Sequence, residues 1–141
     1  MIHLVKLVVG VSSIEELIAR QAQTQNTRQY AGFDTPLPIV RTRSCPRQKE
    51  ALLKGGSLYR VISGMIVCRQ ELKAIEKEIR SDGSEGTVLF LSPVLIRVEA
   101  RPMLPFQGWR YLSAADAPAD KEPVASDFSQ SLLRDLSRLG L

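Results

Sequence analysis

The chain has 141 residues, of which 44% are hydrophobic and 24% are charged, and it carries a formal net charge of +4. This composition excludes an intrinsically disordered chain, and the length suits one domain that buries its own core. Every apolar run is shorter than the roughly 20 residues that span a bilayer, so we expect no contact with a membrane. The apolar N-terminus lacks a signal-peptide cleavage pattern, and we expect a cytoplasmic protein that begins at Met1.

The first third of the chain predicts a strand, a helix and a second strand. Residues 3–9 form a β-rich apolar run. Two overlapping Ser-x-x-Glu capping boxes at 12–16 then start a helix that ends near residue 23. A long polar connection follows, and residues 38–43 predict a short strand.

The middle of the chain predicts a short helix and two strands. Pro46 suits the first turn of a helix, and Gly55-Gly56 ends it. Residues 57–79 predict two strands separated at Ser63-Gly64. The second of these also fits a helical pattern, but the turn-rich segment 81–86 favours a strand hairpin.

The last third predicts strands at 87–91 and 94–98, a loop at 113–124 and a C-terminal helix at 125–141. Together these elements predict a single α+β domain over 1–141, with its core in 1–112. We expect a mostly antiparallel sheet that is curled, with helices flanking it.

The segment RPMLPFQGWRYL at 101–112 contains the only tryptophan of the chain. In a strand, Trp109 and Tyr111 would share one face, and Arg110 and Leu112 the other. We favour a buried Trp109 over an exposed stacking surface, because a lone tryptophan in a small domain is usually well buried.

Basic residues gather in one part of the sequence. Residues 20–60 hold eight basic and two acidic side chains, a net charge of +6. Such a segment suits a face that contacts phosphate groups, and it equally suits a solvated surface that keeps the protein soluble.

The sequence contains no recognisable catalytic or metal-binding arrangement. Its one histidine, His3, lies in the first strand without a nucleophile or a second ligand nearby in sequence, and Cys45 and Cys68 are expected to be free thiols. The glycines at 55–56 follow a helix and would meet its negative end, so an anion near them would need side chains such as Arg41 or Arg60. We therefore expect no cofactor and no metal, and we favour a binding protein over an enzyme.

Several long motifs resemble a known family. LLKGGSLYRVISGMIVCRQEL at 52–72 and RPMLPFQGWRYL at 101–112, with HLVKLVVG at the N-terminus and TR-x-x-PR-x-x-x-x-LL at 42–53, resemble an alphaproteobacterial family known only as domain of unknown function 1489. The resemblance implies no activity. Arg60 departs from the family pattern, which leads us to expect an aromatic residue after Tyr59.

A second resemblance concerns architecture. The order of a strand, a short glycine-ended helix and two long strands is similar to the PUA-like pseudo-barrels of the ASCH and EVE groups. That resemblance implies a cleft for RNA or modified nucleotides, with Ser57 and Tyr59 near it and Trp109 as a stacking wall.

We therefore predict a small domain that binds RNA, another nucleic acid or a nucleotide-like ligand through a basic and aromatic face. The alternatives are a protein-interaction module that forms a homo-oligomer through its C-terminal helix, and an enzyme acting on a small phosphorylated substrate. Gln70 shares the phase of the apolar residues Ile66, Cys68 and Leu72 in its strand, so it is either a buried polar group that finds partners or a group that faces a ligand. The residues predicted to bind the ligand are Arg41, Arg43, Arg47, Ser57, Tyr59, Arg69, Gln70, Gln107, Trp109 and Arg110.

Overall fold

The computed structural model describes residues 1–124, so the C-terminal helix predicted at 125–141 lies outside the described residues. The strands are β1 (Ile2–Leu7), β2 (Thr27–Arg28), β3 (Leu37–Thr42), β4 (Ser57–Ile62), β5 (Met65–Ile79), β6 (Glu85–Pro102), β7 (Trp109–Ser113) and β8 (Asp120–Val124). The helices are α1 (Ile14–Gln21), α2 (Lys49–Leu52) and the 3₁₀ turn η1 (Thr24–Asn26). The predicted α+β class, dominated by a sheet, is confirmed.

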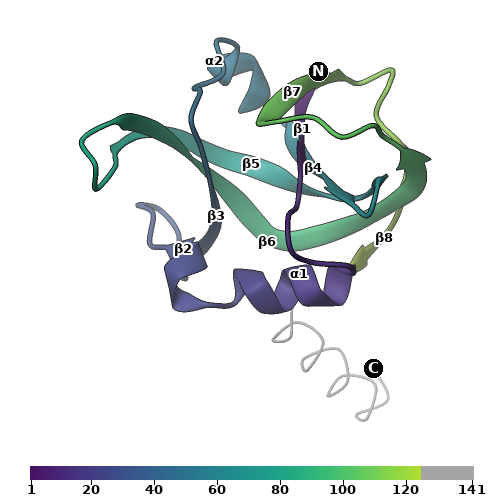
Figure 1. Cartoon of the computed structure of the whole chain (residues 1–141), viewed down its shortest axis with the longest axis horizontal. Coiled ribbons are helices and arrows are strands. Elements are labelled where there is room, and N and C mark those ends of the chain that lie inside the picture. The colour runs from purple at the N-terminus through teal and green to yellow at the C-terminus, as the bar shows by residue number, and fades with distance from the viewer. Residues whose placement is uncertain (125–141) are drawn as a thin grey trace.

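The strands form one open, curled sheet in the order β2-β3-β6-β5-β4-β1-β7, with β8 paired to β6 (Figure 1). Neighbouring strands are antiparallel except β1 and β4, which are parallel, so the sheet is mixed. In Figure 1, α2 and α1 lie at opposite ends of the sheet, and β1 runs between them.

Two long strands give the sheet its curl. β5 and β6 have 15 and 18 residues, against a usual strand length of about 5–6. Their pairing shifts register three times, between Ile66 and Cys68, between Gln70 and Leu72, and between Leu72 and Ala74. Each shift bends the strand and increases its twist. The two bent strands therefore pair with β3 at one end, and with β4 and β8 at the other.

Two sequence predictions for this region were incomplete. The strands predicted at 87–91 and 94–98 are one strand, β6, which continues through Pro93. Proline is tolerated there because residues 92–94 lie between paired stretches on both edges of β6. On one edge β3 pairs with residues 87–90 and β8 with residues 95–98, and on the other the pairing with β5 shifts register between Leu91 and Leu95. The segment 113–124, predicted as a loop, contains β8.

The other predicted strands are confirmed, and the ambiguous segment 70–79 is strand, as favoured. The predicted helix after Pro46 is shorter than expected, since α2 covers only Lys49–Leu52. The predicted start of α1 is confirmed, but one glutamate serves in place of two: both Ser12 and Ser13 form hydrogen bonds with Glu16. The Glu16 amide donates to the Ser13 hydroxyl at 3.1 Å, and the Ser12 hydroxyl donates to the Glu16 carboxylate at 2.7 Å.

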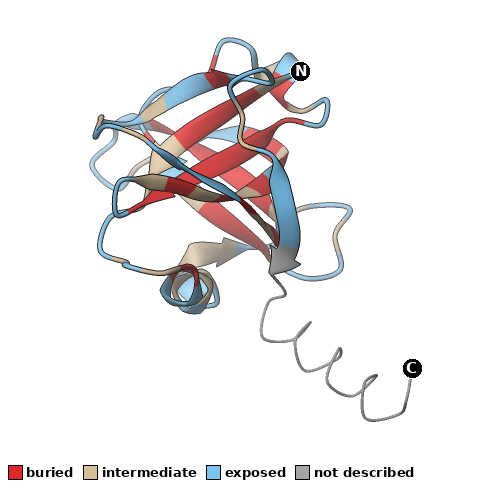
Figure 2. Ribbon diagram, turned by 90° about the vertical axis from the view of Figure 1, so that its right-hand side faces the viewer, coloured by how far each residue is buried: buried red, intermediate tan, exposed pale blue. Residues whose placement is uncertain are grey.

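Both faces of the sheet carry apolar clusters, and the buried residues fill the middle of the strands (Figure 2). We call the face that carries Leu4 and Leu58 the inner face. At one end it packs against Leu52 of α2, and at the other, through Ile62 and Cys68, against Leu17 of α1. The outer face carries two further clusters, one around Tyr59 and Val98 and one around Phe90.

The turn after α2 depends on two glycines. Gly55 has φ of +92°, the left-handed conformation expected of a glycine that ends a helix. Gly56 donates its amide hydrogen to the Leu52 carbonyl at 2.8 Å. A Cβ at Gly56 would overlap the backbone oxygens of both Leu52 and Ile2. Only glycine therefore lets α2 dock against β1.

We predict that Gly56→Ala destabilises the protein by about 2–4 kcal/mol, because the added methyl group meets backbone atoms that cannot move aside. Urea unfolding measures the change. The matched control is Gly83→Ala, at a φ of +86° with open space around it, where we expect a loss of only about 1–2 kcal/mol. Equal losses at the two positions would contradict the close approach at Gly56.

Candidate anion-binding cleft

The two edges of the curled sheet meet through side chains. The indole N–H of Trp109, at the start of β7, donates to the carbonyl of Ser44, just after β3, at 2.9 Å. The amide of Gln48, before α2, donates to the hydroxyl of Tyr111 at 3.0 Å. We call this junction the seam. Because no backbone ladder joins β3 to β7, the seam leaves space between the two edges.

That space is a cleft of about 690 Å³, within the size range of small-molecule sites. Four cationic side chains from different parts of the sequence line it, together with polar groups and the indole, and no carboxylate is among the lining residues. The lining consists of Lys6, Arg41, Thr42, Arg43, Ser44, Arg80, Gln107, Gly108 and Trp109.

The four cations are not equally neutralised. Arg41 is 3.4 Å from the carboxylate of Glu78, which also pairs with Arg28 at 3.0 Å. Within residues 1–124, Lys6, Arg43 and Arg80 have no salt-bridge partner. The cleft is therefore strongly electropositive, and burial lowers the pKa of Lys6, with the nearby charge of Arg60 adding to the effect.

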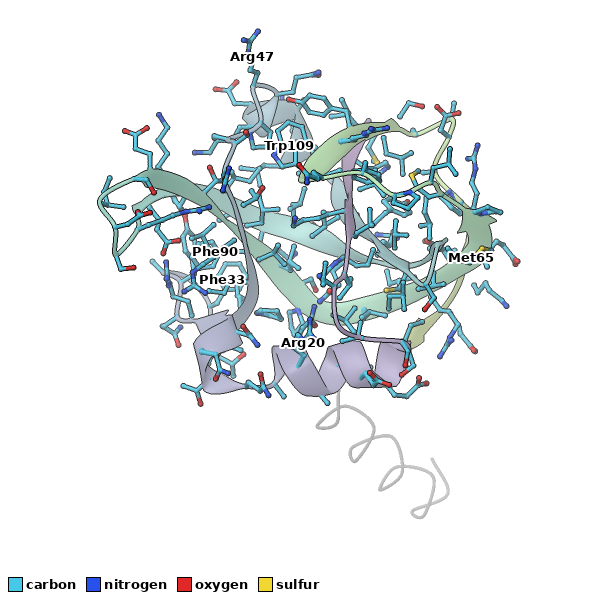
Figure 3. All side chains as sticks on the ribbon, in the orientation of Figure 1. Arg20, Phe33, Arg47, Met65, Phe90 and Trp109 are labelled. Atoms are coloured by element: carbon cyan, nitrogen blue, oxygen red, sulfur yellow. The ribbon has the colours of Figure 1, made fainter. Side chains whose placement is uncertain are left out.

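Trp109 is both a core residue and part of the cleft wall. It is half-buried, packs against the inner-face cluster that contains Leu4 and Leu52, and meets Tyr111 edge-on with ring centroids 4.9 Å apart. Figure 3 shows it between β7 and the base of α2. The predicted alternation is confirmed, with Leu112 buried on the outer face.

A layer of polar side chains lies on the inner face between its two apolar clusters. We call Lys6, Arg60 and Gln70, with Arg20 and Gln21 from α1, the inner polar layer. Lys6 and Arg60 are register partners on β1 and β4, and Arg60 is opposite Cys68 on β5. Arg20 points from α1 towards the sheet (Figure 3) and donates to the Val9 carbonyl.

Gln70 is fully buried and fully paired. Its amide donates to the Ser92 carbonyl at 2.9 Å and to the Gln21 side-chain oxygen at 3.1 Å, and its own oxygen accepts from Gln21 at 2.7 Å. Of the two roles left open for Gln70, the structure supports the satisfied network. Arg60 differs: it is 5% exposed, and its Nε has no hydrogen-bond partner among the described residues.

A second polar cluster lies on the outer face, away from the cleft. Arg69 forms a two-pronged pair with Asp120 at 2.7 and 2.8 Å and donates to the Ser57 hydroxyl at 2.8 Å. The Nδ1 of His3 accepts the Ser57 amide hydrogen at 3.0 Å, so a neutral His3 carries its proton on Nε2. Burial, reinforced by Arg69 and the N-terminus, lowers the pKa of His3 and favours this neutral form. Tyr59 packs edge-on against His3.

The structure brings together four of the ten predicted binding residues. Arg41, Arg43, Gln107 and Trp109 line the cleft. Ser57, Tyr59 and Arg69 belong to the outer cluster, because odd-numbered residues of β4 and β5 face outwards in this region. Gln70 lies in the inner polar layer.

The remaining two predicted residues point elsewhere. Arg110 lies over the Phe106 ring at 4.7 Å on the outer face. Arg47 is exposed and extends away from the body at α2 (Figure 3). Sequence reasoning missed Lys6 and Arg80 in the cleft. For Lys6 the available signal was its charge within the apolar run HLVKLVV. For Arg80, which follows β5, no local signal existed, because its place in the cleft depends on the path of the whole sheet.

Residues 1–124 show no metal-binding cluster, disulfide or membrane-spanning helix. No group of histidine, cysteine and acidic side chains there could hold a metal ion, and both cysteines are free thiols. Burial raises the pKa of the Cys68 thiol to about 11, so it stays protonated. No helix in the described part of the chain has the length and apolar character to cross a membrane.

Comparison with known proteins gives one match. A family model described as Protein of unknown function (DUF1489) matches residues 4–141. Searches of curated proteins and of solved structures find no match.

The Arg69–Asp120 pair gives a prediction about β8. Hydrogen bonds from Arg69 lower the pKa of Asp120 below its ordinary value of 3.8. A carboxyl whose pKa is lower in the folded state stabilises the fold above its ordinary pKa, and this stabilisation is lost as the pH falls through the folded-state value. Because the Asp120 side chain is 47% exposed, we expect Asp120→Asn to cost only about 0.5–1 kcal/mol at neutral pH.

Urea unfolding across pH measures this effect. The difference between the wild type and Asp120→Asn should shrink as the pH falls below the ordinary aspartate value. Glu71→Gln, which removes the exposed partner of Lys73, makes the same change in charge and serves as the control. A loss from Asp120→Asn that is independent of pH would show that the ion pair does not anchor β8.

Proposed function

The chain belongs to the family described as Protein of unknown function (DUF1489). Since that description names no activity, we propose a function from the cleft: the protein binds a nucleotide-like ligand or a nucleic acid. One observation carries the proposal. The cleft sets Lys6, Arg43 and Arg80, which lack salt-bridge partners among the described residues, beside the indole of Trp109.

The charges of the cleft favour phosphate. Arginine presents several donors in a planar fork that matches phosphate oxygens, and lysine adds a point charge. Arg41, Arg43 and Arg80 reach one cleft from β3 and from the end of β5, so their convergence follows from the fold. A planar organic acid without phosphate would use fewer of these donors.

The indole favours a base. Stacking of a nucleobase on an aromatic side chain contributes about 1–3 kcal/mol and needs no particular base sequence. The hydrogen bond from Trp109 to the Ser44 carbonyl fixes the indole before any ligand arrives, so little side-chain entropy is lost on binding. The amide of Gln107 and the hydroxyl of Ser44 add groups that can bond to a sugar or a base edge.

The wider architecture supports the same proposal. We further propose that the curled sheet is a PUA-like pseudo-barrel, because its edges approach each other at the seam and the cleft lies there. In this proposal the ligand site lies at the seam, while Ser57 and Tyr59 contribute to packing on the outer face. A cytoplasmic location and a single domain over 1–141 belong to the same proposal.

We predict that Arg43→Gln and Arg80→Gln each weaken binding of a short single-stranded oligonucleotide several-fold at low salt. Each should also reduce the slope of log affinity against log salt by about 0.7, because one phosphate contact is lost. Quenching of Trp109 fluorescence measures binding, since this is the only tryptophan. The control Arg47→Gln removes an exposed arginine that does not line the cleft, and it should leave the salt slope nearly unchanged.

Equal effects of the three substitutions would contradict the proposal, because they would indicate binding to general surface charge. The absence of fluorescence change and of binding at low salt in the wild-type protein would also contradict it.

A further inference from the structure

Arg60 is a buried cation without a counter-charge. Its side chain lies inside the curled sheet at 5% exposure. No carboxylate of residues 1–124 forms a salt bridge with it. Burial lowers its pKa to about 10, which still leaves the guanidinium charged at neutral pH. A buried charge without a partner lowers the stability of the fold, so Arg60 is not explained by a contribution to stability.

The described part of the protein leaves one buried donor of Arg60 unsatisfied and another weakly bonded. Its Nε has no hydrogen-bond partner among the described residues. Its Nη1 lies 3.5 Å from the side-chain oxygen of Gln70, at the limit of a hydrogen bond, and that oxygen already accepts from Gln21 at 2.7 Å. The Gln70–Gln21 pair is therefore complete without Arg60, and Arg60 is not needed to satisfy it.

Lys6 connects Arg60 with the cleft. The two residues are register partners on the parallel strands β1 and β4, so their side chains point to the same inner face. Lys6 also lines the cleft. Arg20 from α1 is close enough for its charge to act on Arg60 as well. Three cations thus surround one region inside the sheet, and each disfavours the charge of the others in the absence of an anion.

We propose that Lys6, which lines the cleft, and Arg60, its register partner on the neighbouring strand, together hold a terminal phosphate group, so that the ligand is a nucleotide or a phosphorylated end of a nucleic acid. This inference rests on the proposed function of the cleft. It deepens that function by naming the part of the ligand that is recognised.

The burial of Arg60 favours a terminal phosphate group over a phosphodiester within a nucleic-acid strand. A phosphodiester within a strand has chain on both sides, and both sides must leave the site. Arg60, at 5% exposure inside the sheet, offers no exit for a second chain. A phosphate monoester also carries a charge of about −1.5 to −2 at neutral pH, which matches two cations better than the single charge of a diester.

The experiment compares a short thymidine oligonucleotide with and without a 5′ phosphate, using Trp109 fluorescence. We expect the 5′ phosphate to tighten binding to the wild-type protein by roughly tenfold or more, because it gains hydrogen bonds to charged donors. Arg60→Gln should abolish this difference. Arg47→Gln should retain the difference.

The stability of the unliganded protein gives a second readout that does not depend on any ligand. If Arg60 is kept for binding, Arg60→Met removes an unpaired buried charge and should raise the midpoint of thermal unfolding by about 2–5 °C. If Arg60 has a structural role, through ordered water for example, the same substitution should lower the midpoint.

Each outcome has one meaning. Equal binding of the two oligonucleotides to the wild-type protein would overturn the inference about Arg60 and leave the proposed function of the cleft standing. Failure of both oligonucleotides to bind would overturn the proposed function itself. A lower unfolding midpoint for Arg60→Met would overturn the role assigned to Arg60 even if the 5′ phosphate strengthened binding.

Discussion

The side-chain seam between β3 and β7 is the constraint on which the rest of this molecule depends. Backbone pairing would have closed the curled sheet and left no room for a ligand. Instead, the Trp109 indole bonds to the Ser44 carbonyl and the Tyr111 hydroxyl accepts from the Gln48 amide. These two bonds hold the edges near each other while leaving a cleft of about 690 Å³ between them. The aromatic residues that complete the core therefore also form the wall of the candidate site.

The curl of the sheet explains how charges that are distant in sequence meet. Three register shifts bend β5 and β6, and Arg80, the residue after β5, lines the same cleft as residues of β1 and β3. Lys6, Arg43 and Arg80 then line one cleft, although they are widely separated along the chain. The same curl places polar side chains on the inner face between two apolar clusters. Gln70 is satisfied there by Gln21 and the Ser92 carbonyl, whereas Nε of Arg60 has no hydrogen-bond partner within residues 1–124.

The sequence predicted most of the local structure, because apolar periodicity, the serine caps and the glycine turns act over a few residues. It could not predict what depends on the path of the whole sheet. Pro93 suggested a break between two strands, yet β6 continues because its outer partner changes at that point. Arg69 and Gln107 were both predicted to bind the ligand, and only the folded sheet shows that Arg69 lies on the outer face and Gln107 in the cleft. The alternation around Trp109 was predictable, but its double role, in the core and in the cleft, was not.

The cleft and the cations behind it are proposed to form one site for a phosphate-bearing ligand. A crystal structure of the full chain with a bound nucleoside 5′-monophosphate is the decisive measurement. We expect the base to lie against the Trp109 indole and a phosphate oxygen to accept a hydrogen bond from Nε of Arg60, with Lys6 beside it. A nucleotide bound on the outer face near Arg69, or one whose phosphate stays at the surface while Nε of Arg60 bonds to water, would contradict it.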